Sequence, residues 1–211
     1  MTIDFSGQTR GKFSLEELGI QKTDILAAKE VTRPTFSRVH KIALGVIAFL
    51  VELPLSDFIF KGTVWVLQKL GVSDFQSQNC IQILDQLEGN CLMNFSRTAL
   101  RTLFIAYIVF GASIIEEWIF REELYSTQLS LDDHSIEPGK VASRVAWNGA
   151  IFGLCHLDPL QGWTNVPIFV TISTMGMVLA YLREITGDTT ASTTTHMLHN
   201  GSAMIQYMSK V

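Results

Sequence analysis

The feature that most constrains the fold of this chain is a run from Leu103 to Ile115 that contains no charged residue and ends at two adjacent carboxylates, Glu116 and Glu117. Such a run is typical of a helix in a membrane or a buried core, because charged side chains are costly in both places. The residues that follow, Trp118 to Arg121, keep a helical composition. We therefore expect both carboxylates to lie within one long helix, at or just below a membrane boundary.

Further apolar stretches predict more helices on both sides of this run. Residues 42–55 are apolar except for Glu52, and residues 145–157, 166–182 and 189–208 are uncharged. A transmembrane helix needs about 20 predominantly apolar residues, so the shorter or more polar stretches are expected to pack inside a bundle. The predicted fold is an all-α polytopic membrane bundle with at least four embedded helices.

Composition agrees with a multi-pass integral membrane protein. Charged residues make up 17% of the chain and apolar residues 47%, whereas an ordinary soluble domain contains about 25% charged residues. The net charge of −4 provides no basic surface for phosphate backbones, which excludes nucleic acid as a partner.

The chain has three cysteines, Cys80, Cys91 and Cys155. They include no Cys-x-x-Cys pair, which argues against a zinc ribbon. Cys80 and Cys91 flank a short polar stretch. They could form a disulfide or stay as two free thiols, and the sequence does not decide between these two states.

Three charged residues form the pattern Glu-Glu-x-x-x-Arg. Successive helical residues are about 100° apart, so Glu117 and Arg121 lie on one face in the order that favours an ion pair. Glu116 then points in another direction. This geometry suggests that Glu117 is held by the guanidinium while Glu116 faces a cavity and accepts a proton. The alternative is a solvated charge cluster that continues into Glu122 and Glu123.

Imidazole and amide side chains follow in two later stretches. His156 ends the segment that begins at Phe152, whose ring lies one turn earlier and is expected to pack against the imidazole. His196 and Asn200 are four residues apart, so both project from one helical face. Two donors side by side suit an oxyanion site, whereas the alternative is an interhelical hydrogen-bonding pair. His199 lies close to that face and could substitute in either interpretation.

In chain order these motifs resemble the CPBP family of CAAX proteases and bacteriocin-processing proteins, also called Abi. Its members carry Glu-Glu-x-x-x-Arg, Phe-x-x-x-His and His-x-x-x-Asn on successive membrane helices. The resemblance covers roughly residues 100–208. Together with the distribution of charged and apolar residues, it divides the chain into three parts. These are a polar lead at residues 1–38, membrane-associated helices with a polar loop at 39–98, and the family core at 99–211. Within the lead, Ser14 and Glu17 predict the start of a short helix.

The resemblance implies a membrane-embedded peptidase. In such a hydrolase Glu116 and His156 would activate water, Glu117 and Arg121 would organise the site, and His196 with Asn200 would stabilise the oxyanion. The implied partners are a peptide or lipidated-peptide substrate and membrane lipid. No cofactor is required by this glutamate-type scheme.

Two alternatives remain open. In a metallo-type hydrolase, zinc would be held by Glu116, His156 and His196, which supply the usual three protein ligands. In a non-catalytic immunity or scaffold protein, the same polar groups would serve packing or partner binding.

The chain departs from the family pattern in two ways. Glu122 and Glu123 follow the arginine where a glycine often stands, and the first half of the chain offers fewer clear spans. No residue identifies the substrate, and the distribution of Lys and Arg leaves the membrane orientation open.

Overall fold

The computed structural model describes residues 35–72, 97–132 and 135–209, and those from Phe36 onward belong to one compact unit. All elements within the described residues are helices, which confirms the predicted all-α class. Three expectations lie outside the described residues: the helix start at Ser14 and the states of Cys80 and Cys91. Cys155, which is described, is an exposed free thiol.

The first described element is α2 (Arg38–Lys69), a single helix of 32 residues. It begins where the Ser37 hydroxyl accepts a hydrogen bond from the amide of His40, which is an ordinary N-cap. The helix continues through Pro54, so the apolar regions on either side of this proline belong to one element. At 1.5 Å per residue its length is about 48 Å, which exceeds the roughly 30 Å thickness of a bilayer's hydrocarbon core.

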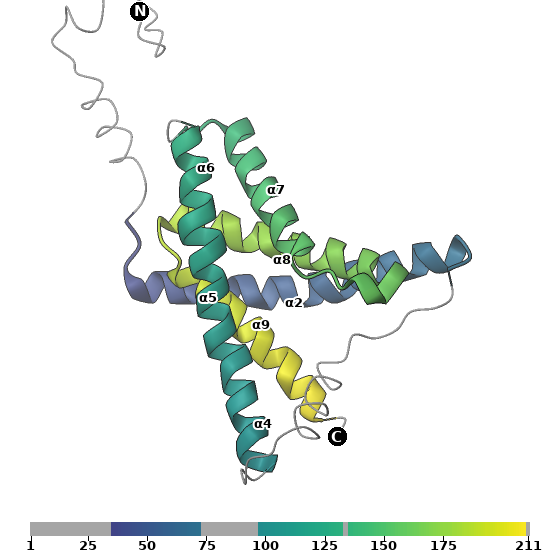
Figure 1. Cartoon of the computed structure of the whole chain (residues 1–211). Helices are drawn as coiled ribbons and strands as arrows, with labels where there is room; N and C mark the ends of the chain where they lie inside the picture. The colour runs from purple at the N-terminus through teal and green to yellow at the C-terminus, as the bar shows by residue number, and fades with distance from the viewer. Residues whose placement is uncertain (1–34, 73–96, 133–134, 210–211) are drawn as a thin grey trace, which may run out of the picture. The chain divides into compact units, whose positions relative to one another are not determined.

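A second long helix carries the two carboxylates, as expected. Figure 1 shows it as one continuous helix in which five segments follow one another. Two of the segments, η1 and η2, have the wider turns of a π-helix, which occur mostly as short insertions in α-helices and frequently at functional sites. The segments are α4 (Arg97–Ala106), η1 (Tyr107–Ala112), α5 (Ser113–Glu117), η2 (Trp118–Leu124) and α6 (Tyr125–Leu131).

The last part of the chain forms α7 (Pro138–Leu154), the short 3₁₀ turn η3 (Pro159–Thr164), α8 (Asn165–Thr186) and α9 (Thr190–Met208). Helix α8 lies alongside α2 (Figure 1). Just beyond its end, Asp188 accepts a hydrogen bond from Lys41 near the start of α2, so the two helices run antiparallel.

Burial alone would raise the pKa of Asp188, but the hydrogen bonds from Lys41 and Thr190 lower it below its ordinary value.

Small residues bring α7 and α8 into close contact. A Cβ added to Gly149 would lie 2.6 Å from the backbone oxygen of Ser173, and one added to Gly153 would lie 2.0 Å from the Ser173 hydroxyl. On the facing helix, a Cβ on Gly176 would lie 3.0 Å from the Cα of Gly149. Close approach of backbones at small residues spaced four apart is a common way to pack membrane helices. This contact holds Phe152, on α7, against α8.

Three helical segments are long and apolar enough to cross a membrane: Arg38–Lys69, Ala99–Leu131 and Pro159–Thr186. Their exposed apolar side chains include Leu50, Phe58 and Phe110. The chain is therefore a multi-pass integral membrane protein. The sequence predicts at least four embedded helices, and an embedded position for α7 or α9, either of which would reach that number, stays a prediction.

We expect Gly149→Ala to lower the free energy of unfolding, because its added methyl carbon would lie 2.6 Å from the Ser173 backbone oxygen. Overpacking of this kind costs about 1–3 kcal/mol. Thermal unfolding of the detergent-solubilised protein measures the change. Gly62→Ala is the control, since nothing lies within 4 Å of a Cβ at that position. Equal falls in melting temperature for both variants would contradict this account of the packing.

Candidate active site

The centre of the candidate site is a buried ion pair on the long helix. Glu117 lies at the end of α5 and is 1% exposed, while Arg121 lies in η2 and is 0% exposed. The guanidinium Nη1 of Arg121 is 3.5 Å from Oε1 of Glu117. The two residues form the pair that their spacing predicts, so each charge lies next to its opposite instead of being buried alone.

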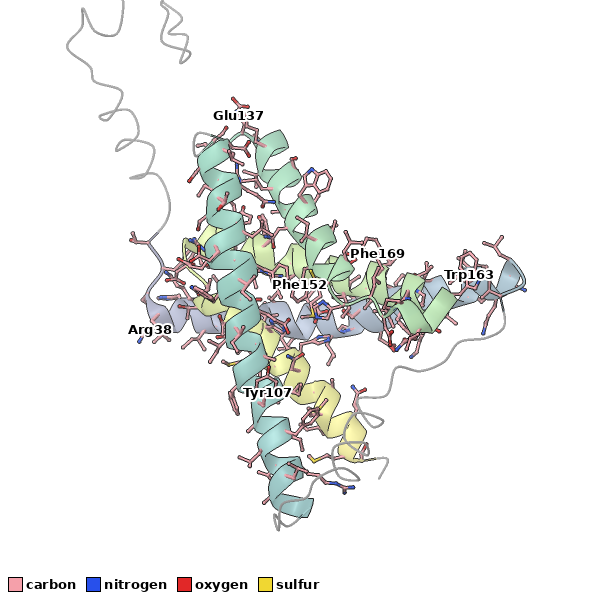
Figure 2. The ribbon with its side chains drawn as sticks, viewed as in Figure 1. Arg38, Tyr107, Glu137, Phe152, Trp163 and Phe169 are labelled. Atoms are coloured by element: carbon pink, nitrogen blue, oxygen red, sulfur yellow. The ribbon has the colours of Figure 1, made fainter. Side chains whose placement is uncertain are left out.

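Arg121 is also held by the two helices that pack together through glycines. Its Nη2 donates a hydrogen bond of 3.1 Å to the backbone carbonyl of Gly176 on α8. The guanidinium carbon lies 4.4 Å from the ring centroid of Phe152 on α7, a distance at which a cation is attracted to an aromatic face. Figure 2 shows Phe152 where α7 approaches the long helix. The arginine therefore joins three helices.

Glu116 points away from this pair, as expected, and faces two imidazoles. Its Oε2 lies 3.6 Å from Nε2 of His156 and 3.6 Å from Nε2 of His196. Within the described part of the chain, this buried oxygen has no hydrogen-bond partner. The structure thus brings Glu116, His156 and His196 together from α5, the end of α7 and α9.

The other ring nitrogen of each imidazole is already engaged. Nδ1 of His156 lies 2.7 Å from the backbone carbonyl of Phe152. Nδ1 of His196 lies 3.1 Å from Oε1 of Glu117. A carbonyl and an ionised carboxylate only accept hydrogen bonds, so both Nδ1 atoms act as donors. In a neutral ring this leaves Nε2 with a lone pair directed towards Glu116.

Phe152 contacts both rings and limits their orientation. Its centroid lies 4.6 Å from that of His156, as the sequence spacing suggested, and 5.7 Å from that of His196 in an edge-to-face arrangement. Phe152 is completely buried and packs with Phe120, Met175 and Leu179 in the hydrophobic core. The imidazoles are therefore positioned by a rigid aromatic side chain.

Asn200 lies beside this group and binds the long helix. Its Nδ2 donates to the carbonyl of Ile108 at 3.2 Å and to the hydroxyl of Ser113 at 3.0 Å. Ile108 belongs to η1, and Ser113 begins α5. Both amide protons are engaged, so Asn200 would have to give up one of these bonds to donate to a substrate.

Sequence reasoning missed a second asparagine with a parallel contact. Asn148 on α7 is completely buried, and its Nδ2 donates to the carbonyl of Phe120 at 2.7 Å. Phe120 belongs to η2. Each of the two π-helical segments, η1 and η2, therefore contains a carbonyl that accepts a hydrogen bond from an asparagine of another helix. The available signal was a polar residue within the uncharged stretch at 145–157, although that signal does not identify its partner.

His199, which the sequence left open as a substitute, makes a separate contact. Its Nδ1 lies 2.8 Å from Oε2 of Glu52 on α2. Glu122, one of the two departures from the family pattern, lies 3.4 Å from Nε of Arg183. Neither contact includes the residues around Glu116.

The grouping of Glu116, His156 and His196 can hold a molecule that donates protons. When both imidazoles are neutral, three acceptor atoms converge, because Oε2 of Glu116 lies 3.6 Å from Nε2 of each ring. Polar atoms at this separation are commonly bridged by water. The same acceptors are the kind that bind zinc. The described residues include no group of three or more His, Cys, Asp or Glu side chains arranged to hold a metal ion.

Arg121→Met should strongly destabilise the protein, because it leaves Glu117 as a buried carboxylate without its cation. Breaking a buried pair costs about 3–5 kcal/mol, which thermal unfolding in detergent measures. Adding Glu117→Gln to Arg121→Met should restore part of the loss.

Lys61→Met is the matched control for this change. Lys61 and Asp57 also form a pair four residues apart, but their side chains are 73% and 60% exposed. Exposed pairs contribute at most about 1 kcal/mol. Similar falls in melting temperature for Arg121→Met and Lys61→Met would show that the buried pair contributes no more to stability than the exposed pair.

Comparison with known families identifies the region that contains this site. Residues 98–202, about half of the chain, match the family model described as type II CAAX prenyl endopeptidase Rce1-like. The matched region extends from α4 into α9 and includes every residue discussed around Glu116. Searches of curated proteins and of solved structures found no match. The chain belongs to the CPBP family and is a CAAX-type intramembrane protease.

Proposed function

We propose that the protein hydrolyses a peptide bond at or within the bilayer by attack of a water molecule held between Glu116 and His156. The observation that carries this proposal is the approach of Oε2 of Glu116 to Nε2 of His156 at 3.6 Å, because both atoms accept hydrogen bonds when this imidazole is neutral. Acceptors do not bind one another, whereas a water molecule donates two protons and can bridge them.

In the proposed reaction, Glu116 is the general base. Water donates one hydrogen bond to Oε2 of Glu116 and one to Nε2 of His156. As the water oxygen forms a bond to the carbonyl carbon of the substrate, its proton moves to Glu116. When the carbon–nitrogen bond breaks, that proton passes to the leaving amine.

His196 is proposed to stabilise the oxyanion. The site contains two carboxylates, Glu116 and Glu117, but one guanidinium, so one more proton is needed for neutrality. A proton on Nε2 of His196 would supply it, because its Nδ1 already donates to Glu117. This imidazolium would then donate towards the developing negative charge, which is most effective where water is excluded.

Asn200 is proposed as the second oxyanion donor. Its amide lies next to the Ser113 hydroxyl, which can rotate and accept from another donor. One amide proton would thereby become available to substrate while the Ile108 bond is kept. A non-catalytic role has one observation in its favour, namely that both hydrogen bonds of Asn200 join helices. That alternative predicts that the purified wild-type protein cleaves no peptide.

Membership of the CAAX protease family suggests the class of substrate. We propose a peptide or lipidated peptide that reaches the site from the membrane. A farnesylated peptide with three residues after its cysteine is the appropriate first probe. Release of the terminal tripeptide can be followed in proteoliposomes.

Glu116→Gln and His156→Ala should each abolish cleavage of this probe, because each removes one side of the water site. The double variant should be no slower than either single variant, since residues that act as a unit are not additive. Glu123→Gln, an exposed change on the same helix, is the control and should cleave normally. Multiplicative losses would argue against a shared water. A Glu116→Gln protein with full turnover would exclude Glu116 as the general base.

The metal alternative predicts a different response to chelation. In the proposed scheme, activity persists after treatment with a membrane-permeable chelator, and Asn200→Ala lowers the rate by on the order of 10² to 10³. If zinc were held by Glu116, His156 and His196, chelation would remove one ion per chain, and stoichiometric zinc would restore turnover. Metal analysis of the purified, active protein distinguishes the two schemes.

A further inference from the structure

A second buried contact between a carboxylate and an imidazole lies outside the site described above. Glu52 on α2 is 1% exposed, and its Oε2 accepts a hydrogen bond of 2.8 Å from Nδ1 of His199. Its other oxygen, Oε1, accepts from the hydroxyl of Ser56 one turn later. Both carboxylate oxygens therefore have partners. Because ionisable residues in apolar spans are costly, they commonly mark functional positions.

Glu52 belongs to a contact that fixes one face of α9 against α2. Thr195 donates from its hydroxyl to the carbonyl of Gly45 at 2.9 Å, and a Cβ on Gly45 would lie 2.6 Å from the carbonyl of Ala191. Ala191, Thr195 and His199 are four residues apart, so they form one stripe along α9. On α2, Gly45 and Glu52 are two turns apart and also share a face.

The neighbouring stripe of α9 carries the candidate active-site residues. His196 binds Glu117, and Asn200 binds Ser113, so this stripe faces the long helix. His196 directly follows Thr195 in the sequence, and Asn200 directly follows His199. The two stripes are therefore about 100° apart around the axis of α9. A rotation of α9 that weakened the contact between His199 and Glu52 would therefore also move His196 and Asn200.

We propose that Glu52 is a positioning residue for the peptidase reaction: through His199, it fixes the rotation of α9 and hence the placement of His196 and Asn200. This inference rests on the proposed function. Compared with well-packed apolar residues, a buried polar pair adds little stability, and in some proteins it selects one arrangement of helices. The directional bond of 2.8 Å provides such a selection between α2 and α9.

The test compares four variants in proteoliposomes with the farnesylated peptide. Glu52→Gln keeps an acceptor for His199 and should cleave at nearly the normal rate. Glu52→Leu removes the acceptor and should lower kcat on the order of 10- to 100-fold with little change in KM, because small misplacements of catalytic groups cost this much. Glu52→Leu with His199→Leu should restore melting temperature but not kcat. Asp57→Asn, an exposed change on α2, is the control.

A second measurement does not depend on turnover. The chain has five histidines, so the ring nitrogens of His196 can be assigned by ¹⁵N NMR of labelled protein in detergent, using His196→Gln for comparison. Glu52→Leu should shift these signals, whereas Glu52→Gln and Asp57→Asn should leave them in place. If the wild-type protein cleaves no peptide, the proposed function fails, but a shift of the His196 signals still supports the positioning role.

Two results would overturn the inference. One is a folded Glu52→Leu protein with normal kcat and unchanged His196 signals. The other is full recovery of kcat in the Glu52→Leu and His199→Leu double variant, since the pair would then contribute only stability.

Discussion

Burial of the Glu117 carboxylate is the constraint on which the rest of the site depends. An isolated ionised carboxylate in an apolar environment is very unfavourable, so oppositely charged and hydrogen-bonding groups must come to it. Arg121 does so from the same helix, and His196 does so from α9. Arg121 then binds the Gly176 carbonyl, which it reaches because glycines let α7 and α8 pack closely. The long helix, α7, α8 and α9 are thus linked to this one carboxylate, either directly or through Arg121.

Hydrogen bonds at Nδ1 give the two imidazoles their orientation. Nδ1 of His196 is directed to Glu117, and Nδ1 of His156 is directed to the Phe152 carbonyl. Each ring must therefore present Nε2 on its opposite side, where Glu116 lies. Glu117 and Glu116 are adjacent in sequence but have different neighbours: Glu117 is paired with Arg121 and His196, whereas Oε2 of Glu116 faces Nε2 of both imidazoles.

The part of the site that follows from helix geometry could be predicted from the sequence. The pairing of Glu117 with Arg121, the different direction of Glu116 and the contact of Phe152 with His156 all depend on spacings of one to four residues. The fold class and the membrane character follow from long apolar runs. The catalytic roles of these residues and the function of Asn200 stay predictions.

Contacts between distant segments could not be predicted in this way. The sequence of the long helix gave no sign of the wider turns in η1 and η2, where the carbonyls of Ile108 and Phe120 accept hydrogen bonds from asparagines of other helices. The partner of His199 is 147 residues away. A spacing of three from His196 suggested a shared role, but the helix instead turns the two rings towards different neighbours.

Helix α9 shows how such distant contacts restrict the orientation of a helix. A helix packed on one side can rotate until its apolar contacts are satisfied, and apolar packing tolerates several arrangements. Hydrogen bonds on two adjacent faces restrict that freedom, because His199 binds Glu52 on one face while His196 binds Glu117 on the next. The polar residues that make α9 a poor candidate for a lipid-facing span are therefore those that determine its orientation within the bundle.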